Sequence, residues 1–269
     1  MKWMKYRFIY LLISGTLIIA GILSMIKWGF NVGIEFTGGS TLEYKLPNGN
    51  IKTYKEKEIT EERKIEIKTN LEKEVGGEVL EVGFESIGPT VGPETVKRTI
   101  YALIISTSAI LLWIAYQFKN YKFGVSATLA TLHDSLILIG SFSLLGHFFG
   151  AEIDFLFVTA LLTILSFSVH DTIVVFDRIR EMSKGSIKSV SELADIAISE
   201  TMVRSINNSF TIIFMLLSLI LLGGESIKWF AVALLIGTVS GTYSSPFVAV
   251  SILATWDGFA KKARLKKSK

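Results

Sequence analysis

The sequence predicts a mainly α-helical membrane protein: a bundle of six transmembrane helices with a small α+β extracytoplasmic domain between the first and second helices. Half of the 269 residues are apolar. They are concentrated in six long blocks of about 20 residues, which is enough to cross a bilayer as a helix. Only one long stretch between the blocks is rich in charged residues and glycine, and its length of about 70 residues suits a small independent domain.

Residues 1–27 contain a basic N-terminus and the first apolar block, which runs from about Phe8 to Ile26. A secretory signal peptide would have a shorter apolar core followed by a small-residue cleavage site. No clear site of that kind follows the block. We therefore expect the block to be retained as the first transmembrane helix.

Residues 28–97 are rich in Lys, Glu and Gly, which predicts a small soluble domain. If the first helix starts in the cytoplasm, this domain is extracytoplasmic. Strands are predicted at Ser40–Leu46 and at Val79–Ile87, where apolar and polar residues alternate as in a half-buried strand. Thr60–Val75 predicts a charged helix with an apolar side. The Gly-Pro pairs at 88–89 and 92–93 predict a turned connector into the next block.

Residues 98–254 contain the other five apolar blocks. Helices are predicted at 99–118, 123–145, 154–176, 203–222 and 229–254. The segment 177–202 between the fourth and fifth helices is polar, and Ser189-Val-Ser-Glu192 is a capping-box pattern. We expect a short amphipathic helix there, as a surface connector or, less favoured, as a partner-binding element.

The distribution of Lys and Arg predicts the orientation in the membrane. Outside the 28–97 domain, most of these residues lie in 1–7, 119–122, 177–202 and 255–269. Six helices place these four segments on one side, which the positive-inside rule identifies as the cytoplasm. We therefore expect both termini in the cytoplasm and the tail 255–269 against anionic lipid.

Several function classes fit the sequence poorly. The basic residues lack interleaved aromatics and lie next to membrane helices, which argues against nucleic-acid binding. There is no cysteine, so a disulfide, a thiolate metal site and a cysteine nucleophile are excluded. No nucleotide-binding loop is present, and no paired catalytic pattern indicates an enzyme. We expect a protein without cofactor that is driven by a partner or by the membrane potential.

The ionisable side chains inside the predicted helices are His133 and Asp134 in the third, His170 and Asp171 in the fourth, and Arg204 at the start of the fifth. An Asp at the centre of a membrane helix costs about 2.5–3.5 kcal/mol, so each Asp predicts a buried partner or a role in ion movement. Asp171 and Arg204 lie at the same end of consecutive helices and are expected to pair.

This pair allows two interpretations. Burial raises a carboxyl pKa and a nearby Arg lowers it, so movement of Arg204 would load or unload a proton on Asp171, with His170 as a relay. Alternatively, the pair is a structural ion pair. We favour proton coupling for Asp171 and a structural role for His133 and Asp134.

No metal site is predicted, because the His and Asp of each pair are adjacent and are expected to point to different sides of their helix. Small and polar residues indicate close helix packing instead. Gly237 and Gly241 form a GxxxG pattern in the sixth helix, for which plain packing is the favoured interpretation. Asn207 and the polar residues after it give the fifth helix a polar first half.

Several of these segments resemble motifs of one family. Gly33-Ile-Glu-Phe-Thr-Gly-Gly-Ser40 resembles a G-(I/V)-D-F-x-G-G signature, through Gly33, Glu35, Phe36, Gly38 and Gly39. The other matching segments are 130–134, 168–181 with Asp177 and Arg178, 201–211 with Arg204 and Asn207, and 237–247 with Gly237 and Gly241. On these motifs, which follow in order over nearly the whole chain, the chain is identified as a member of the SecF family. Glu35 replaces the usual Asp, and His170 replaces a frequent Asn.

The resemblance implies a subunit of a SecDF complex of the resistance-nodulation-division superfamily, in the cytoplasmic (inner) membrane. Such a complex uses the proton-motive force to help export secretory polypeptides. Its implied partners are SecD and the SecYEG channel, with SecA and YajC-type subunits. The family's proton-path Asp falls on Asp171 and its functional Arg on Arg204. The alternatives are an exporter subunit for small molecules or lipids, for which 28–97 is small as a cargo domain, and a purely structural subunit.

Overall fold

The computed structural model describes residues 2–88, 91–118 and 120–267, and the side chains as far as residue 259. Parts of the predicted Gly-Pro connector at 88–93, of the loop at 119–122 and of the basic tail at 255–269 therefore lie outside the described residues. The chain divides into two compact units. Unit 1 comprises Met1–Asn31, Ile104–Ala151 and Leu156–Lys269, and unit 2 comprises Val32–Leu103 and Glu152–Phe155.

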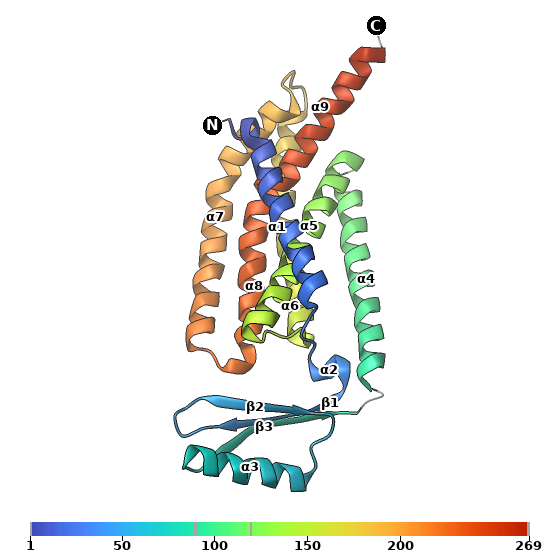
Figure 1. Ribbon diagram of the computed structural model, residues 1–269. Coiled ribbons are helices and arrows are strands. Elements are labelled where there is room, and N and C mark those ends of the chain that lie inside the picture. Colours follow the sequence, from blue (N-terminus) through green and yellow to red (C-terminus); the bar gives the residue numbers. More distant parts are fainter. Residues whose placement is uncertain (1, 89–90, 119, 268–269) are drawn as a thin grey trace. The chain divides into compact units, whose positions relative to one another are not determined.

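Unit 1 is a helical bundle (Figure 1). Its elements are η1 (Trp3–Tyr6), α1 (Arg7–Trp28), most of α4 (Val91–Phe118), α5 (Tyr121–Phe149), α6 (Phe155–Ser183), α7 (Val190–Leu222), α8 (Glu225–Ser244), the π-helical turn η2 (Ser245–Ala249) and α9 (Val250–Lys267). Six helical stretches of the described residues are long and apolar enough to cross a membrane. This confirms the predicted class, a mainly helical protein with six membrane helices.

The helices differ in how deeply they are buried. In the most apolar window of each, half of the residues are buried in α5 and in α6, and 56% in the α8–α9 stretch. The corresponding shares are 17% for α1 and for α7, and 6% for α4. The helices α5, α6 and α8 therefore form the centre of the bundle, where a polar side chain must find its partners within the protein.

The helix α7 differs from the prediction. The prediction of a short helix within 177–202, separate from the membrane helix at 203–222, was wrong. The structure has one helix of 33 residues, Val190–Leu222. It begins at the predicted capping box, in which Ser189 and Glu192 bond each other's backbone N–H groups. No Gly or Pro follows in this range to end the helix.

The helices α1 and α5 pack closely through small residues. Ser24 donates a hydrogen bond of 2.9 Å to Ser143, which in turn donates to the carbonyl of Gly29 at 2.7 Å. Near this pair, Gly21 faces Gly140, and a Cβ atom added to Gly140 would lie 2.6 Å from the Gly21 Cα. The two backbones touch because neither glycine has a side chain.

Unit 2 is a small α+β unit. Its sheet has the order β2-β1-β3, with β1 (Gly39–Lys45) paired antiparallel to both β2 (Ile51–Glu56) and β3 (Leu80–Ile87). The strand β2 was missed from the sequence, because its alternating Lys, Thr and Tyr residues lie on an edge and give a weak apolar pattern. The helices of unit 2 are α2 (Ile34–Thr37), α3 (Glu61–Val75) and the first part of α4.

A single apolar core holds unit 2 together. Leu42 and Tyr44 of β1 pack with Ile67 and Leu71 of α3, and all four are almost fully buried. The α3 helix starts at Thr60, whose side chain accepts a hydrogen bond from the Arg63 N–H, and it is followed by a left-handed Gly76. The helix α3 thus covers one face of the sheet, as the apolar side of Thr60–Val75 predicts.

Candidate functional site

Two carboxylates are buried among the membrane helices. Asp134 of α5 has no exposed surface, and Asp171 of α6 is 7% exposed. A buried carboxylate is stable only if hydrogen bonds or charges replace the water it has lost. The two residues meet this requirement in different ways.

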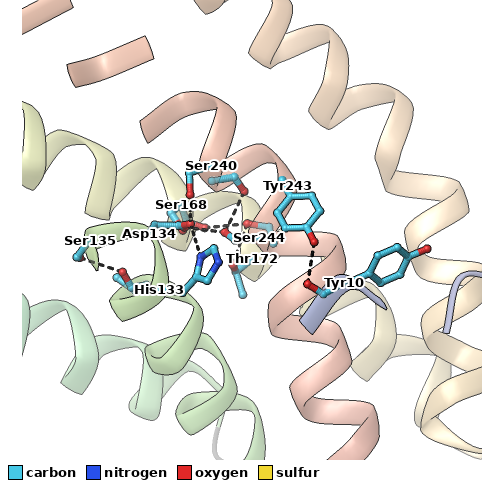
Figure 2. Close-up of polar contacts among 12 residues, drawn as sticks. Tyr10, His133, Asp134, Ser135, Ser168, Thr172, Ser240, Tyr243 and Ser244 are labelled. Atoms are coloured by element: carbon cyan, nitrogen blue, oxygen red, sulfur yellow. Dashed lines mark hydrogen bonds and ion pairs between the residues drawn. The ribbon is translucent and has the colours of Figure 1, made fainter. Parts of the chain in front are cut away.

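Asp134 lies in a cluster of hydroxyl groups that we call the Asp134 cluster: Asp134, His133, Ser168, Ser240 and Ser244 (Figure 2). Ser168 of α6 donates to Oδ2 at 2.5 Å, and Ser244 of α8 donates to the same oxygen at 2.6 Å. Ser240 donates to Oδ1 at 2.6 Å. Ser240 and Ser244 are four residues apart and so share one face of α8. One carboxylate therefore joins α5, α6 and α8.

His133 completes this cluster, with its Nδ1 atom 3.0 Å from Asp134 Oδ1. The expectation that the two side chains point to different sides of the helix was wrong. Adjacent residues are about 100° apart on a helix, but both side chains bend around the helix far enough to meet. The His133 Nε2 atom is buried and has no partner among the described residues.

A second pair of hydroxyls extends the cluster along α6. Thr172 of α6 and Ser245 of η2 are hydrogen-bonded at 2.9 Å. The Ser245 hydroxyl also lies 3.2 Å from the Ser168 carbonyl and is oriented to donate to it. In this way, the consecutive residues Ser244 and Ser245 bond to Asp134 on α5 and to α6, respectively.

Asp171 lies beside a cavity of about 230 Å³ between α6 and α7, which we call the Asp171 cavity. Its polar lining residues are His170, Asp171, Thr201, Arg204, Ser205 and Asn208. The Ser205 hydroxyl donates a short hydrogen bond to Asp171 Oδ2. A water molecule occupies about 30 Å³ in the liquid, so the cavity has room for several.

Arg204 does not pair with Asp171 as expected. In the described part of the chain no ion pair joins them, and the direct partner of Asp171 is Ser205. Ser205 faces α6, and its neighbour Arg204 is about 100° further around α7. Both residues still line the Asp171 cavity, so the Arg204 charge acts on Asp171 through the cavity.

The other residues singled out on the membrane helices lie outside the Asp171 cavity. Asp177 pairs with Arg180 at 2.9 Å, and Arg178 pairs with Glu200 at 2.5 Å, which links α6 to α7. Asn207 is exposed, and its neighbour Asn208 lines the cavity instead.

Gly237 and Gly241 serve packing. An added Cβ on Gly237 would lie 2.1 Å from Ile164 Cδ1, and one on Gly241 would lie 3.3 Å from Ser168 Cβ. The two glycines therefore let α8 approach α6 closely enough for Ser240 and Ser244 to reach the Asp134 cluster.

The signature at 33–39 lies in unit 2, at the turn from α2 into β1. Gly38 and Gly39 have φ values of 72° and 125°, a region that favours glycine. Phe36 is buried and contacts Phe155 edge-on, with ring centroids 5.2 Å apart. Gly33 is buried and donates its backbone N–H to the Ile153 carbonyl at 2.9 Å. This signature therefore stabilises a local turn.

Glu35 is the charged residue of this signature. Burial raises the pKa of its carboxyl group, and the charges of Asp154, Glu85 and Glu152 raise the pKa further. Within the described residues, no group of His, Asp and Glu side chains has the arrangement of a metal site.

The hydroxyl partners of both carboxylates were not predicted from the sequence. Serine is common wherever membrane helices pack closely, so a serine in an apolar block does not by itself indicate a functional role. This applies to the serines around Asp134, which are Ser168, Ser240 and Ser244, and to Ser205 beside Asp171. The spacing of Ser240 and Ser244 by four residues was the one available sign that they face the same neighbour.

Comparisons with known proteins identify relatives of this chain. The family model described as "Protein export membrane protein SecD/SecF, C-terminal" matches residues 67–258. The protein translocase subunit SecF of Thermobaculum terrenum is 37% identical over 94% of this chain and 93% of its own length. The SecDF protein of Bacillus subtilis is 28% identical over 94% of this chain but only 37% of its own length.

A solved structure agrees with this result. The crystal structure of SecDF from Thermus thermophilus, described as a translocon-associated membrane protein, superimposes with a TM-score of 0.86 at 29% identity. The match covers 96% of this chain and 39% of the SecDF chain. The present chain therefore matches nearly all of a separate SecF subunit and less than half of a SecDF protein.

Proposed function

Since this chain belongs to the SecD/SecF family of protein-export membrane proteins, we propose that it is the SecF-type subunit of a complex that uses the proton-motive force to help export secretory polypeptides. The chain is a multi-pass membrane protein. A SecD subunit would supply the part of the SecDF proteins that this chain does not cover. The complex would work beside SecYEG, with SecA and YajC-type subunits, in the cytoplasmic membrane.

The proposed orientation places both termini in the cytoplasm, where the basic segments 1–7 and 255–269 lie near anionic lipid. The domain at 28–97 is then extracytoplasmic and meets the emerging polypeptide. The role is one of transport and not of catalysis.

The Asp171 cavity is the observation that supports proton coupling. A carboxylate beside a polar cavity can receive a proton from water without leaving the membrane. When Asp171 is ionised, the Ser205 hydroxyl donates to it and the nearby Arg204 charge stabilises it. Once Asp171 is protonated, both interactions weaken, so the preferred distance between α6 and α7 changes.

The energy available is sufficient for such a change. One proton charge crossing 100 mV is worth about 2.3 kcal/mol, which shifts a two-state equilibrium about fifty-fold. The apolar parts of the described membrane helices contain few other ionisable groups, so we propose that SecD completes the proton path.

The test is export by an Asp171→Asn variant. The chain and its SecD partner are placed in vesicles with the SecYEG channel, and export of a secretory protein is measured with and without a proton gradient. We expect the variant to assemble but to lose the gradient-dependent part of export. The matched control is Glu225→Gln, a carboxylate at the start of α8 that pairs with Lys228 outside the cavity. If Asp171→Asn keeps the full gradient response, the proposal is wrong.

A further inference from the structure

Asp134 is the most completely bonded carboxylate in the membrane part of the described chain, and the mechanism above does not use it. It receives four polar contacts, two on each oxygen: His133 and Ser240 at Oδ1, and Ser168 and Ser244 at Oδ2. An ionised carboxylate accepts hydrogen bonds only, and its two oxygens suit this number of donors. The geometry is that of a fixed acceptor that holds donors in place.

The donors tie Asp134 to the helix that carries Asp171. Ser168 lies one turn before Asp171 on α6, about 4.5 Å along the helix axis. Thr172, the residue after Asp171, bonds to Ser245, which also bonds to the Ser168 carbonyl. The turn of α6 that contains Asp171 is thus held from the side of α5, α8 and η2.

The opposite side of this turn is less constrained. The Asp171 side chain faces α7. At this level, α6 and α7 are joined by the hydrogen bond that Ser205 donates to Asp171. The helix α7 is linked to α8 by a bond of 2.6 Å between Ser209 and Thr242. Asp171 therefore lies between a group of three helices joined by hydrogen bonds and a less buried fourth helix.

We propose that Asp134 is a positioning residue for Asp171. It fixes the turn Ser168–Thr172 of α6 against α5 and α8, so that a change of protonation at Asp171 is expressed as movement of α7 and is not absorbed by α6. This inference rests on the proposed function of Asp171. In this inference Asp134 does not transfer a proton, and the three serines that donate to it hold α5, α6 and α8 together.

The test measures the chemical state of Asp171 directly. A hydrophobic carbodiimide reacts with protonated carboxyl groups in membranes, and mass spectrometry of the peptides separates labelling at Asp171 from labelling at Asp134. The labelling is followed against pH for the complex with SecD in vesicles. We expect Asp134→Ala to move the midpoint for Asp171 by about one pH unit, the usual spread of carboxyl pKa values between protein environments. Because a shift of one pH unit changes proton binding about tenfold, we also expect gradient-dependent export to fall about tenfold.

Two further variants test the hydrogen bonds themselves. Asp134→Asn keeps one acceptor oxygen, and hydroxyl groups can turn to accept hydrogen bonds from its amide. This variant should therefore keep an Asp171 midpoint close to that of the unmodified protein and most of the gradient-dependent export. Ser143→Ala is the matched control, because it removes a buried hydroxyl of α5 about 14 Å further along the helix. It should leave the Asp171 midpoint unchanged.

The outcomes separate this inference from the proposed function. If Asp134→Ala assembles and the Asp171 midpoint does not move, Asp134 is not a positioning residue. If Asp134→Ala does not assemble, Ser168→Ala is tested in its place, because it removes one of the four contacts of Asp134. An unmoved Asp171 midpoint in that variant likewise overturns the inference. If Asp171→Asn keeps the full gradient response, the proposed function fails, whatever the labelling shows.

Discussion

Replacing Gly140 with alanine should separate α1 from α5. The added Cβ would lie 2.6 Å from the Gly21 Cα and 3.2 Å from the Gly21 carbonyl carbon. Carbon atoms in contact are about 3.5–4.0 Å apart, so the overlap is about 1 Å. The nearest atoms belong to the backbone and cannot rotate away, so the helices themselves must move.

The expected cost follows from two opposing terms. Overpacking in a tight core costs about 1–3 kcal/mol, and an overlap with backbone atoms lies in the upper part of this range, at about 2–3 kcal/mol. Alanine is about 1 kcal/mol better than glycine within a helix, which offsets part of that cost. We therefore expect a net loss of about 1–2 kcal/mol in the free energy of unfolding. At about 2–4 °C per kcal/mol for a chain of this size, the midpoint should fall by about 2–8 °C.

Thermal unfolding in detergent, followed by circular dichroism, measures this shift. The matched control is Gly15→Ala on α1, where an added Cβ would meet nothing within 4 Å. That variant should be as stable as the unmodified protein or slightly more stable. Equal midpoints for the two variants would refute the close contact between α1 and α5.

Three other outcomes are expected. Glu35→Gln should stabilise unit 2 near neutral pH. Burial raises the pKa of the Glu35 carboxyl group in the folded state above its unfolded value of about 4.3. The protonated carboxyl group therefore contributes stability at acid pH, and this stability is lost as the pH rises from about 4.3 through the folded-state pKa. The variant should therefore flatten this pH dependence in denaturant unfolding, and an unchanged slope would contradict the assignment. Ser189→Ala should cost about 1 kcal/mol by removing the α7 cap, seen as faster hydrogen exchange in the first turn and not in α3. Ser205→Ala should lower gradient-dependent export severalfold, whereas Ser218→Ala, which removes only a bond to its own helix, should not.

The fold class was predictable because a bilayer allows few structures. Spanning segments must satisfy their own backbone hydrogen bonds, so a long apolar block predicts a helix almost by itself. The extent of α7 was not predictable in this way. Its first turns are polar, and only the absence of Gly and Pro between 190 and 222 indicated that the helix continues.

The candidate site was predicted in part. Buried charges are costly enough to be conspicuous in an apolar block, which is why Asp134 and Asp171 could be identified. Their partners depend on rotation around each helix axis. A difference of one residue places Ser205 and not Arg204 against Asp171. The Asp134 cluster brings together residues from three helices, and beyond the four-residue spacing of Ser240 and Ser244 nothing in the local sequence indicates that they converge.

Proton flux through the complex tests the central claim, that Asp171 carries the coupled proton. Vesicles containing this chain and SecD, with a pH-sensitive dye inside, are given a defined pH difference and membrane potential. We expect Asp171→Asn to abolish the flux above the leak of empty vesicles, while Glu225→Gln retains it. Equal flux through Asp171→Asn and the unmodified protein would contradict the account.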